Sequence, residues 1–335
     1  MGRLALTLGL LWLLSGTALA GETLNSVKSS KTLRCGVGGG IAGLSVRAAD
    51  GRWSGLDVDF CRAVAVATAG DDARVAYKAL PTLGRFPALM SGEIDILARN
   101  ATWTLGREAT LGIVFTGPLL YSPQGVLVRA DSGAKDIADI DGMRICVVKD
   151  STQDASLLFW AMRTKLHIEK VGLDSDEQAR EAFFRGDCQG YASDAVLLAA
   201  MRLEAPGGQD AYGIISDNLT MDPISPAVRQ GDAAWRQLVT AVWASLLLAE
   251  EFGLAQTDFQ PGAPMSPAKE VFLRKSDALA KPLGIEPGWA ARAVAAVGNY
   301  GEMFARNLGR ESPLRLERGP NRLWSQGGLM LPPDF

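Results

Sequence analysis

The strongest constraint on the fold is an alternation of short buried strands and helices in the first hundred residues. Apolar, β-branched runs at 33–37, 75–78 and 94–98 predict strands, and the stretches 55–67 and 86–90 between them predict helices. This strand–helix order is typical of a parallel sheet with right-handed crossovers. The first part of the chain therefore belongs to the α/β class.

The same order returns further along the chain. A turn leads into a strand at 144–148, a helix begins near 151, and a helix at 177–185 precedes a strand at 190–194. Two prolines then force extended backbone between 214 and 226, which predicts a return crossing. Helices are also predicted at 232–252 and 289–304, with a turn at 318–321, and both Trp289 and Trp324 are expected in the core.

Polar side chains follow the predicted strands of both halves, where each strand ends. They are Thr102, Thr104 and Arg107 in the first half, and Ser151, Thr152 and Asp194 in the second. Open α/β sheets bind ligands at the carboxyl ends of their strands, so two such sets can face each other across a crevice. An arginine and helix-start amides suit a carboxylate, and an aspartate suits an ammonium group. The pattern predicts a site for a zwitterion.

The first twenty residues predict export. Arg3 is followed by an apolar run and the small-residue ending Ala18-Leu19-Ala20, which is typical of a signal peptide cleaved before Gly21. The roughly 315 residues that follow are enough for two α/β domains. A formal net charge of −3 without a basic block argues against nucleic acid as a partner.

Four cysteines in an exported chain predict two disulfides. Their spacing favours the local pairs Cys35 with Cys61 and Cys146 with Cys188, although sequence alone leaves crossed pairings open.

Two other kinds of site are not supported by the sequence. His167 is the only histidine, so a two-histidine zinc site is excluded, and no nucleophile motif accompanies it. Gly38, Gly40 and Gly43 match a dinucleotide-binding pattern, but no helical periodicity follows them to hold a pyrophosphate. We expect neither a metal nor a cofactor.

The chain closely resembles the solute-binding proteins of polar and general L-amino-acid ABC transporters of Gram-negative bacteria, from about Val27 to its end. The motifs that carry the resemblance are Trp53-Ser54-Gly55-Leu56-Asp57-Val58-Asp59-Phe60-Cys61-Arg62-Ala63, Ser91-Gly92-Glu93-Ile94-Asp95, Arg99-Asn100-Ala101-Thr102-Trp103-Thr104, Pro226-Ala227-Val228-Arg229-Gln230-Gly231-Asp232 and Gly298-Asn299-Tyr300-Gly301-Glu302. The resemblance implies the type II periplasmic binding protein fold, in which two α/β lobes are joined by two crossing hinge segments. We expect a signal peptide at 1–20, lobe 1 at 21–127 plus 224–335 with a C-terminal helical extension, and lobe 2 at 128–223.

The resemblance also implies roles for individual residues. Arg107 resembles the family's carboxylate-binding arginine, with Thr102 and Thr104 as hydroxyl and backbone contacts. Thr152, beside Ser151, resembles the ligand contact at the helix start of the second lobe, and Asp194 resembles the acid that receives the α-amino group. The family's paired cysteines match Cys35, Cys61, Cys146 and Cys188.

Three positions depart from the family pattern. Relatives usually show Asn-Thr-Gly where this chain has Gly38-Gly39-Gly40, and an aromatic residue over the ligand where this chain has Leu44. They carry glycine at the position of Asp150, whose carboxylate would repel a ligand carboxylate or meet a cationic side chain. Leu44 and Asp150 are therefore candidate ligand contacts that bear on ligand identity.

The expected function is that of a periplasmic, monomeric, non-enzymatic receptor. It would bind an L-amino acid and deliver it to an inner-membrane ABC permease. One alternative is an enzyme of the cyclohexadienyl (arogenate or prephenate) dehydratase type on the same fold, with Asp150 as its acid. Another is a ligand receptor for a sensor kinase, which the neighbouring genes would distinguish.

Overall fold

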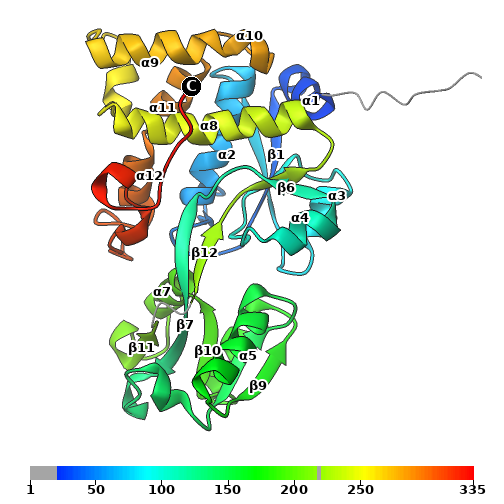
Figure 1. Cartoon of the computed structure of the whole chain (residues 1–335), viewed down its shortest axis with the longest axis vertical. Helices are drawn as coiled ribbons and strands as arrows, with labels where there is room; N and C mark the ends of the chain where they lie inside the picture. The colour runs from blue at the N-terminus through cyan, green and yellow to red at the C-terminus, as the bar shows by residue number, and fades with distance from the viewer. Residues whose placement is uncertain (1–20, 217–219) are drawn as a thin grey trace, which may run out of the picture.

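Two main sheets organise the chain, one in each of two lobes that lie end to end (Figure 1), and a third sheet among the described residues has only two strands. The computed structural model describes residues 21–216 and 220–335, so the signal peptide expected at 1–20 lies outside the described residues. The described strands are β1 (Thr32–Val37), β2 (Val46–Arg47), β3 (Trp53–Ser54), β4 (Arg74–Ala79), β5 (Ile96–Leu97), β6 (Ile113–Phe115), β7 (Leu120–Arg129), β8 (Arg144–Val148), β9 (Glu169–Leu173), β10 (Gly190–Asp194), β11 (Tyr212–Ile215), β12 (Met221–Ile224) and β13 (Ala227–Arg229).

Helices surround both sheets and also form the outer end of the first lobe. They are α1 (Glu22–Ser30), α2 (Leu56–Ala69), α3 (Arg85–Met90), α4 (Leu105–Leu111), α5 (Thr152–Thr164), α6 (Asp176–Arg185), α7 (Ala195–Leu203), α8 (Ala233–Glu251), α9 (Pro267–Ala278), α10 (Ala280–Leu283), α11 (Trp289–Val297) and α12 (Tyr300–Asn307). Within the described residues, none of these helices has the length and apolar character needed to cross a bilayer.

The sheet of the first lobe confirms the expected strand–helix order. Its strand order is β4-β1-β5-β13-β6, and β1 pairs in parallel with both β4 and β5. The returning strand β13 is antiparallel to β5 and β6, so this sheet is mixed and not purely parallel. The parallel strands β1 and β5 end on the side that faces the second lobe.

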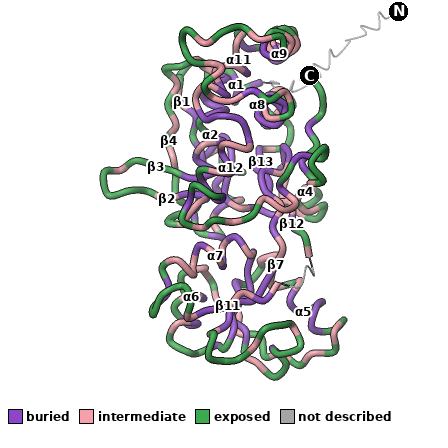
Figure 2. The backbone as a smooth tube through the Cα atoms, turned by 90° about the vertical axis from the view of Figure 1, so that its left-hand side faces the viewer, coloured by how far each residue is buried: buried purple, intermediate pink, exposed green. Residues whose placement is uncertain are grey.

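Helix α2 forms the centre of the first lobe's core, and buried residues follow it along most of its length (Figure 2). The glycine before it is required, because Gly55 has φ +130° and a Cβ there would lie 2.1 Å from the Leu44 carbonyl oxygen. Asp57 and Asp59 in the first turn suit the positive end of the helix dipole.

The second lobe contains the strand order β11-β7-β10-β8-β9. Strand β10 pairs in parallel with β8 and antiparallel with β7. Separate apolar clusters, with Phe183 in one and Trp160 in the other, fill the two faces of this sheet. The structure joins Cys35 to Cys61 and Cys146 to Cys188, which confirms the local pairings.

Two strands connect the lobes. The first part of β7 pairs antiparallel with β12, where Tyr121 lies opposite Pro223 and Leu120 opposite Ile224. The rest of β7 continues into the second sheet, where it pairs with β10 and β11. These strands are the two crossing segments, and the extended backbone expected before Pro226 is present in β12.

The C-terminal part covers the outside of the first lobe, with two differences from expectation. The predicted helix at 289–304 is two helices, because Gly298 has φ +81° and Asn299 begins α12 with a capping box to Glu302. Trp289 is buried in the core as expected, but Trp324 is 54% exposed, and its indole Nε1 donates a hydrogen bond to Glu251.

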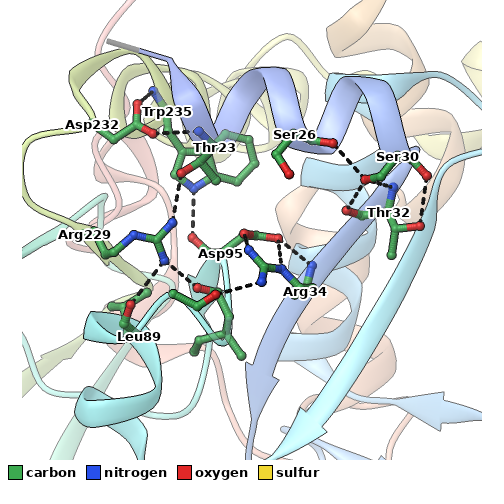
Figure 3. A network of polar contacts seen from close by, with 12 residues as sticks. Thr23, Ser26, Ser30, Thr32, Arg34, Leu89, Asp95, Arg229, Asp232 and Trp235 are labelled. Atoms are coloured by element: carbon green, nitrogen blue, oxygen red, sulfur yellow. Dashed lines mark hydrogen bonds and ion pairs between the residues drawn. The ribbon is translucent and has the colours of Figure 1, made fainter. Parts of the chain in front are cut away.

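A polar network ties the N-terminal helix to the start of α8 (Figure 3). Asp232 caps α8 by accepting a 3.0 Å hydrogen bond from the Trp235 amide, and its other oxygen accepts a 3.0 Å bond from the Thr23 amide. The Trp235 indole donates to the Asp95 carbonyl, and Arg229 donates to Thr23 Oγ1. One carboxylate therefore holds two helices on the sheet.

We expect Asp232→Ala to lower the free energy of unfolding by about 2 kcal/mol, since it removes a helix cap and leaves the Thr23 amide without its acceptor. Urea unfolding of the purified protein measures this change. Asp210→Ala is the matched control, because Asp210 is exposed and should change stability by less than about 0.5 kcal/mol. Equal effects of the two substitutions would contradict the proposed role of Asp232.

Candidate ligand-binding site

A small cavity lies between the two lobes, where the strand ends of both sheets meet. The first lobe contributes Thr82, Arg85, Asn100 and Thr102 to its wall, and the second contributes Ser151, Thr152, Gln153, Asp176, Ser193 and Asp194. The cavity holds about 20 Å³ of free space, which is room for about one water. The lobes are thus closed on each other, and a larger molecule needs them to separate before it can enter.

Polar contacts between the lobes hold this closed arrangement. The hydroxyl oxygens of Thr102 and Thr152 lie 3.0 Å apart across the cleft. Asp176 of α6 accepts hydrogen bonds from the Thr82 hydroxyl and, at 3.3 Å, from Arg99 Nη2. The contacts join residues that the sequence places in different halves of the chain.

The loop after β5 positions the first-lobe residues. Thr104 caps α4 by accepting a 3.1 Å hydrogen bond from the Arg107 amide, so it supports the helix start. Arg107 Nη1 donates to the Thr102 carbonyl at 2.6 Å, and its guanidinium lies 5.2 Å from the centre of the Phe86 ring. Arg107 therefore stands next to a wall residue but does not itself line the cavity. Burial lowers its pKa, and the charges of Asp194 and Asp222 oppose that shift.

The second lobe presents the start of α5. Ser151 caps this helix, accepting from the Asp154 amide at 3.1 Å and donating to the Val148 carbonyl at 2.6 Å. Thr152 follows as the first helical residue and reaches across to Thr102. The sequence-predicted residues Thr102, Ser151, Thr152 and Asp194 are thus brought together around one cavity.

Asp194 is the most deeply buried acid of this wall. It ends β10, is 1% exposed, and its Oδ1 has no hydrogen-bond partner among the described residues. Burial raises its pKa to about 8, and the nearby Asp222 carboxylate adds to the shift, while Gln153 and Arg85 oppose it. A cationic group placed here would stabilise the carboxylate form.

Two of the candidate contacts lie elsewhere. Leu44 is buried in the core of the first lobe and does not line the cavity. Its backbone packs against Gly55, the residue before α2. Asp150 is exposed and has φ +57°, a backbone conformation that glycine adopts without strain. Neither side chain lines the cavity between the lobes. The dehydratase alternative, which needs Asp150 as an acid beside the substrate, is therefore not supported by the position of Asp150.

Several residues of the cavity wall are not among those that the sequence pattern predicts. Arg85, Gln153 and Asp176 line the cavity, and Asp222 lies behind it, accepting from Gln124 Nε2 at 2.9 Å and from Thr102 at 3.3 Å. Arg85 has a sequence signal, because it is the one charged residue of the short helix α3. The others follow from the way in which the two lobes meet, which no local pattern shows.

The histidine that the sequence singled out lies outside this site. His167 is 92% exposed at its side chain, as a surface histidine should be. Among the described residues, no group of three or more His, Cys, Asp or Glu side chains could hold a metal ion.

Comparison with known proteins agrees with this architecture. The sequence profile of the bacterial extracellular solute-binding proteins, family 3, matches residues 33–256. The general L-amino acid-binding periplasmic protein AapJ of Rhizobium johnstonii is 37% identical over 95% of this chain and 94% of its own length. The glutamate/glutamine/aspartate/asparagine-binding protein BztA of Rhodobacter capsulatus is 35% identical, with 96% of both chains covered.

A solved structure is similar over nearly the whole chain. It is an ABC transporter periplasmic binding protein from Brucella ovis with glutathione bound, which is 35% identical with a TM-score of 0.87 and covers 92% of this chain and 98% of its own. A two-lobed α/β architecture and a profile match over most of the sequence lead to one conclusion: the chain belongs to the bacterial extracellular solute-binding proteins, family 3.

Proposed function

We propose that this protein captures an L-amino acid in the cavity between its lobes and delivers it to an ABC permease in the inner membrane. The observation that carries the proposal is Asp194, a buried carboxylate with an unpartnered oxygen at the point where both lobes meet. The relatives AapJ and BztA, named as binders of amino acids, support the same class of ligand.

The proposed contacts match the two charged groups of an amino acid. Asp194 would accept hydrogen bonds from the α-ammonium group, and the hydroxyl groups of Thr102 and Thr152 would bind the α-carboxylate. Arg107 would join them by turning from the Thr102 carbonyl, to which it donates in the closed form, into the cavity. Thr104 and Ser151 would fix this geometry through the helix starts that they cap. These contacts bind and orient the ligand without covalent chemistry, and we propose a receptor and not an enzyme.

Entry of the ligand would require bending at β7 and β12. We propose lobe 1 at 21–123 and 224–335 and lobe 2 at 124–223, with the two crossing strands as the hinge. The first boundary lies before the expected residue 127 because Gln124 to Leu127 pair with β10 of the second sheet. We further propose that residues 1–20 are a cleaved signal peptide, that the mature protein is a periplasmic monomer, and that its partner is a permease.

Isothermal titration of the mature protein, beginning at Gly21, with each of the twenty amino acids tests the proposal. We expect at least one ligand with micromolar or tighter affinity, since several charge-assisted bonds form in a water-excluded site. If no amino acid binds, the protein is not a receptor for free amino acids.

Asp194→Asn and Arg107→Ala should each weaken that binding by about 100-fold or more, because each removes one member of a buried charge pair. The same titration measures the loss. Asp187→Asn is the matched control, because Asp187 is exposed and pairs only with Arg185, so its affinity should equal that of the wild type. Unchanged affinity in both site variants would reject the site but leave the receptor function standing.

Binding should release up to one proton near pH 7. In the ligand-free protein, the raised pKa of Asp194, about 8, keeps this acid protonated at pH 7, and an arriving ammonium group favours the carboxylate. Titrations in two buffers with different ionisation enthalpies measure the release. It should disappear above about pH 9 and in Asp194→Asn, and release that persists in this variant would assign the proton to another group.

Asp194 should also make the ligand-free protein less stable as the pH rises from about 4 to 8. Over this range the folded state holds a proton that the unfolded state has lost, so stability falls with increasing pH. In thermal unfolding, the melting temperature of Asp194→Asn should therefore rise relative to that of the wild type as the pH increases across this range. A constant difference between the two would contradict burial of an ionisable carboxyl.

A further inference from the structure

Arg85 is a buried cation in the wall of the ligand cavity. It begins α3, the short helix of the first lobe, and is only 5% exposed. Its side chain lines the same cavity as Asp194 and Thr102 (α3 is labelled in Figure 1).

This guanidinium lacks an anionic partner in the described part of the chain. Its Nε is buried without a hydrogen-bond acceptor, and the structure gives its side chain no ion pair. Its one contact with a defined geometry is the Phe86 ring, whose centre lies 4.9 Å away. Arg99 and Arg107 repel it, and the carboxyl groups of Asp176 and Asp194 attract it more weakly without forming an ion pair with it.

The neighbouring arginines are engaged, which sets Arg85 apart. Arg99 donates to the Leu80 carbonyl at 2.6 Å and to Asp176 at 3.3 Å. Arg107 donates to the Thr102 carbonyl. Arg85 is therefore the guanidinium of this group with its donors still free.

An unpaired buried charge is expensive. The group loses its hydration without gaining a partner, and burial, followed by repulsion from Arg99 and Arg107, lowers the pKa of Arg85 to about 9. Such a cost is recovered when an anion enters and accepts the free N–H groups, since an arginine can hold a carboxylate by two parallel bonds.

The position of Arg85 indicates which anion this is. The guanidinium groups of Arg85 and Arg107 both lie within about 6 Å of the centre of the Phe86 ring. The two guanidinium groups are therefore at most about 10 Å apart, a span that one small molecule with two carboxylates can bridge. If Arg107 and Asp194 take the α-carboxylate and the ammonium group, Arg85 is left facing the ligand's side chain.

We propose that Arg85 binds a second carboxylate, so that the ligand carries one ammonium group and two carboxylates. This inference rests on the proposed function and narrows it to acidic ligands. Two kinds of molecule share this chemistry: an acidic amino acid, and a peptide such as glutathione. An amide side chain could accept from Arg85 but would not neutralise its charge, so the acid should bind more tightly than its amide.

The test compares wild type with Arg85→Met by isothermal titration against the twenty amino acids and glutathione. Wild type should bind L-glutamate or L-aspartate at least 10-fold more tightly than the matching amide, or bind glutathione. Arg85→Met should weaken binding of that acidic ligand by about 100-fold. The variant should therefore no longer bind the acid more tightly than its amide. Arg85→Lys, which keeps the charge but not the paired donors, should fall between the two.

Controls separate this inference from folding and from the proposed function. Arg52→Met is the matched control, because Arg52 is exposed and pairs only with nearby Asp50. Ligand-free Arg85→Met should melt at or above the wild-type temperature, since it loses an unpaired buried charge.

Three outcomes would overturn the inference. If wild type binds neutral amino acids as tightly as acidic ones, or if Arg85→Met binds the acidic ligand like wild type, Arg85 does not bind a second carboxylate although the receptor function stands. If wild type binds nothing in the panel, both the inference and the receptor function are wrong.

Discussion

The antiparallel pairing of β7 with β12 is the constraint on which the arrangement of the lobes depends. Each lobe has its own sheet, and these two strands carry the chain from one to the other. The C-terminal turn also reaches this crossing, because the Asn321 side chain accepts from the Tyr121 amide at 2.7 Å and donates to its carbonyl at 3.0 Å. The first lobe therefore fixes β7 at Tyr121. Bending is then expected between Tyr121 and Gln124, where β7 enters the second sheet.

The crossing brings together groups that would be unfavourable anywhere else in the protein. Asp194 and Arg85 are both almost fully buried, and neither has an ion-pair partner among the described residues. A protein selected only for stability would replace such groups, since burial of an ionisable group without a partner costs free energy whether the group stays charged, like Arg85, or is held protonated, like Asp194. Their presence in one cavity is best explained by a ligand that carries the opposite charges.

Local patterns predicted the elements well and the site only in part. Strand–helix alternation and end signals located β1, α2, β10 and α8 to within a few residues, because apolar periodicity and caps act over one or two turns. The break between α11 and α12 depends on one glycine and one capping side chain. Apolar periodicity is read over a window of several turns, so it does not detect a break at a single residue. Arg85 and Asp176 become wall residues only through the packing of one lobe on the other, and no window of sequence contains that information.

Closure can be understood from the balance between the contacts across the cleft and the charges inside it. The bonds from Thr102 to Thr152 and from Arg99 and Thr82 to Asp176 form only when the lobes meet, and they favour the closed form. Closure also removes water from Asp194 and Arg85. This loss of hydration favours the open form until a ligand pairs with both side chains. Moving the equilibrium from 1% to 99% closed takes about 5.5 kcal/mol of differential binding. Two buried charge pairs can supply most of that energy, so the same unpaired groups that destabilise the empty closed form make closure depend on the ligand.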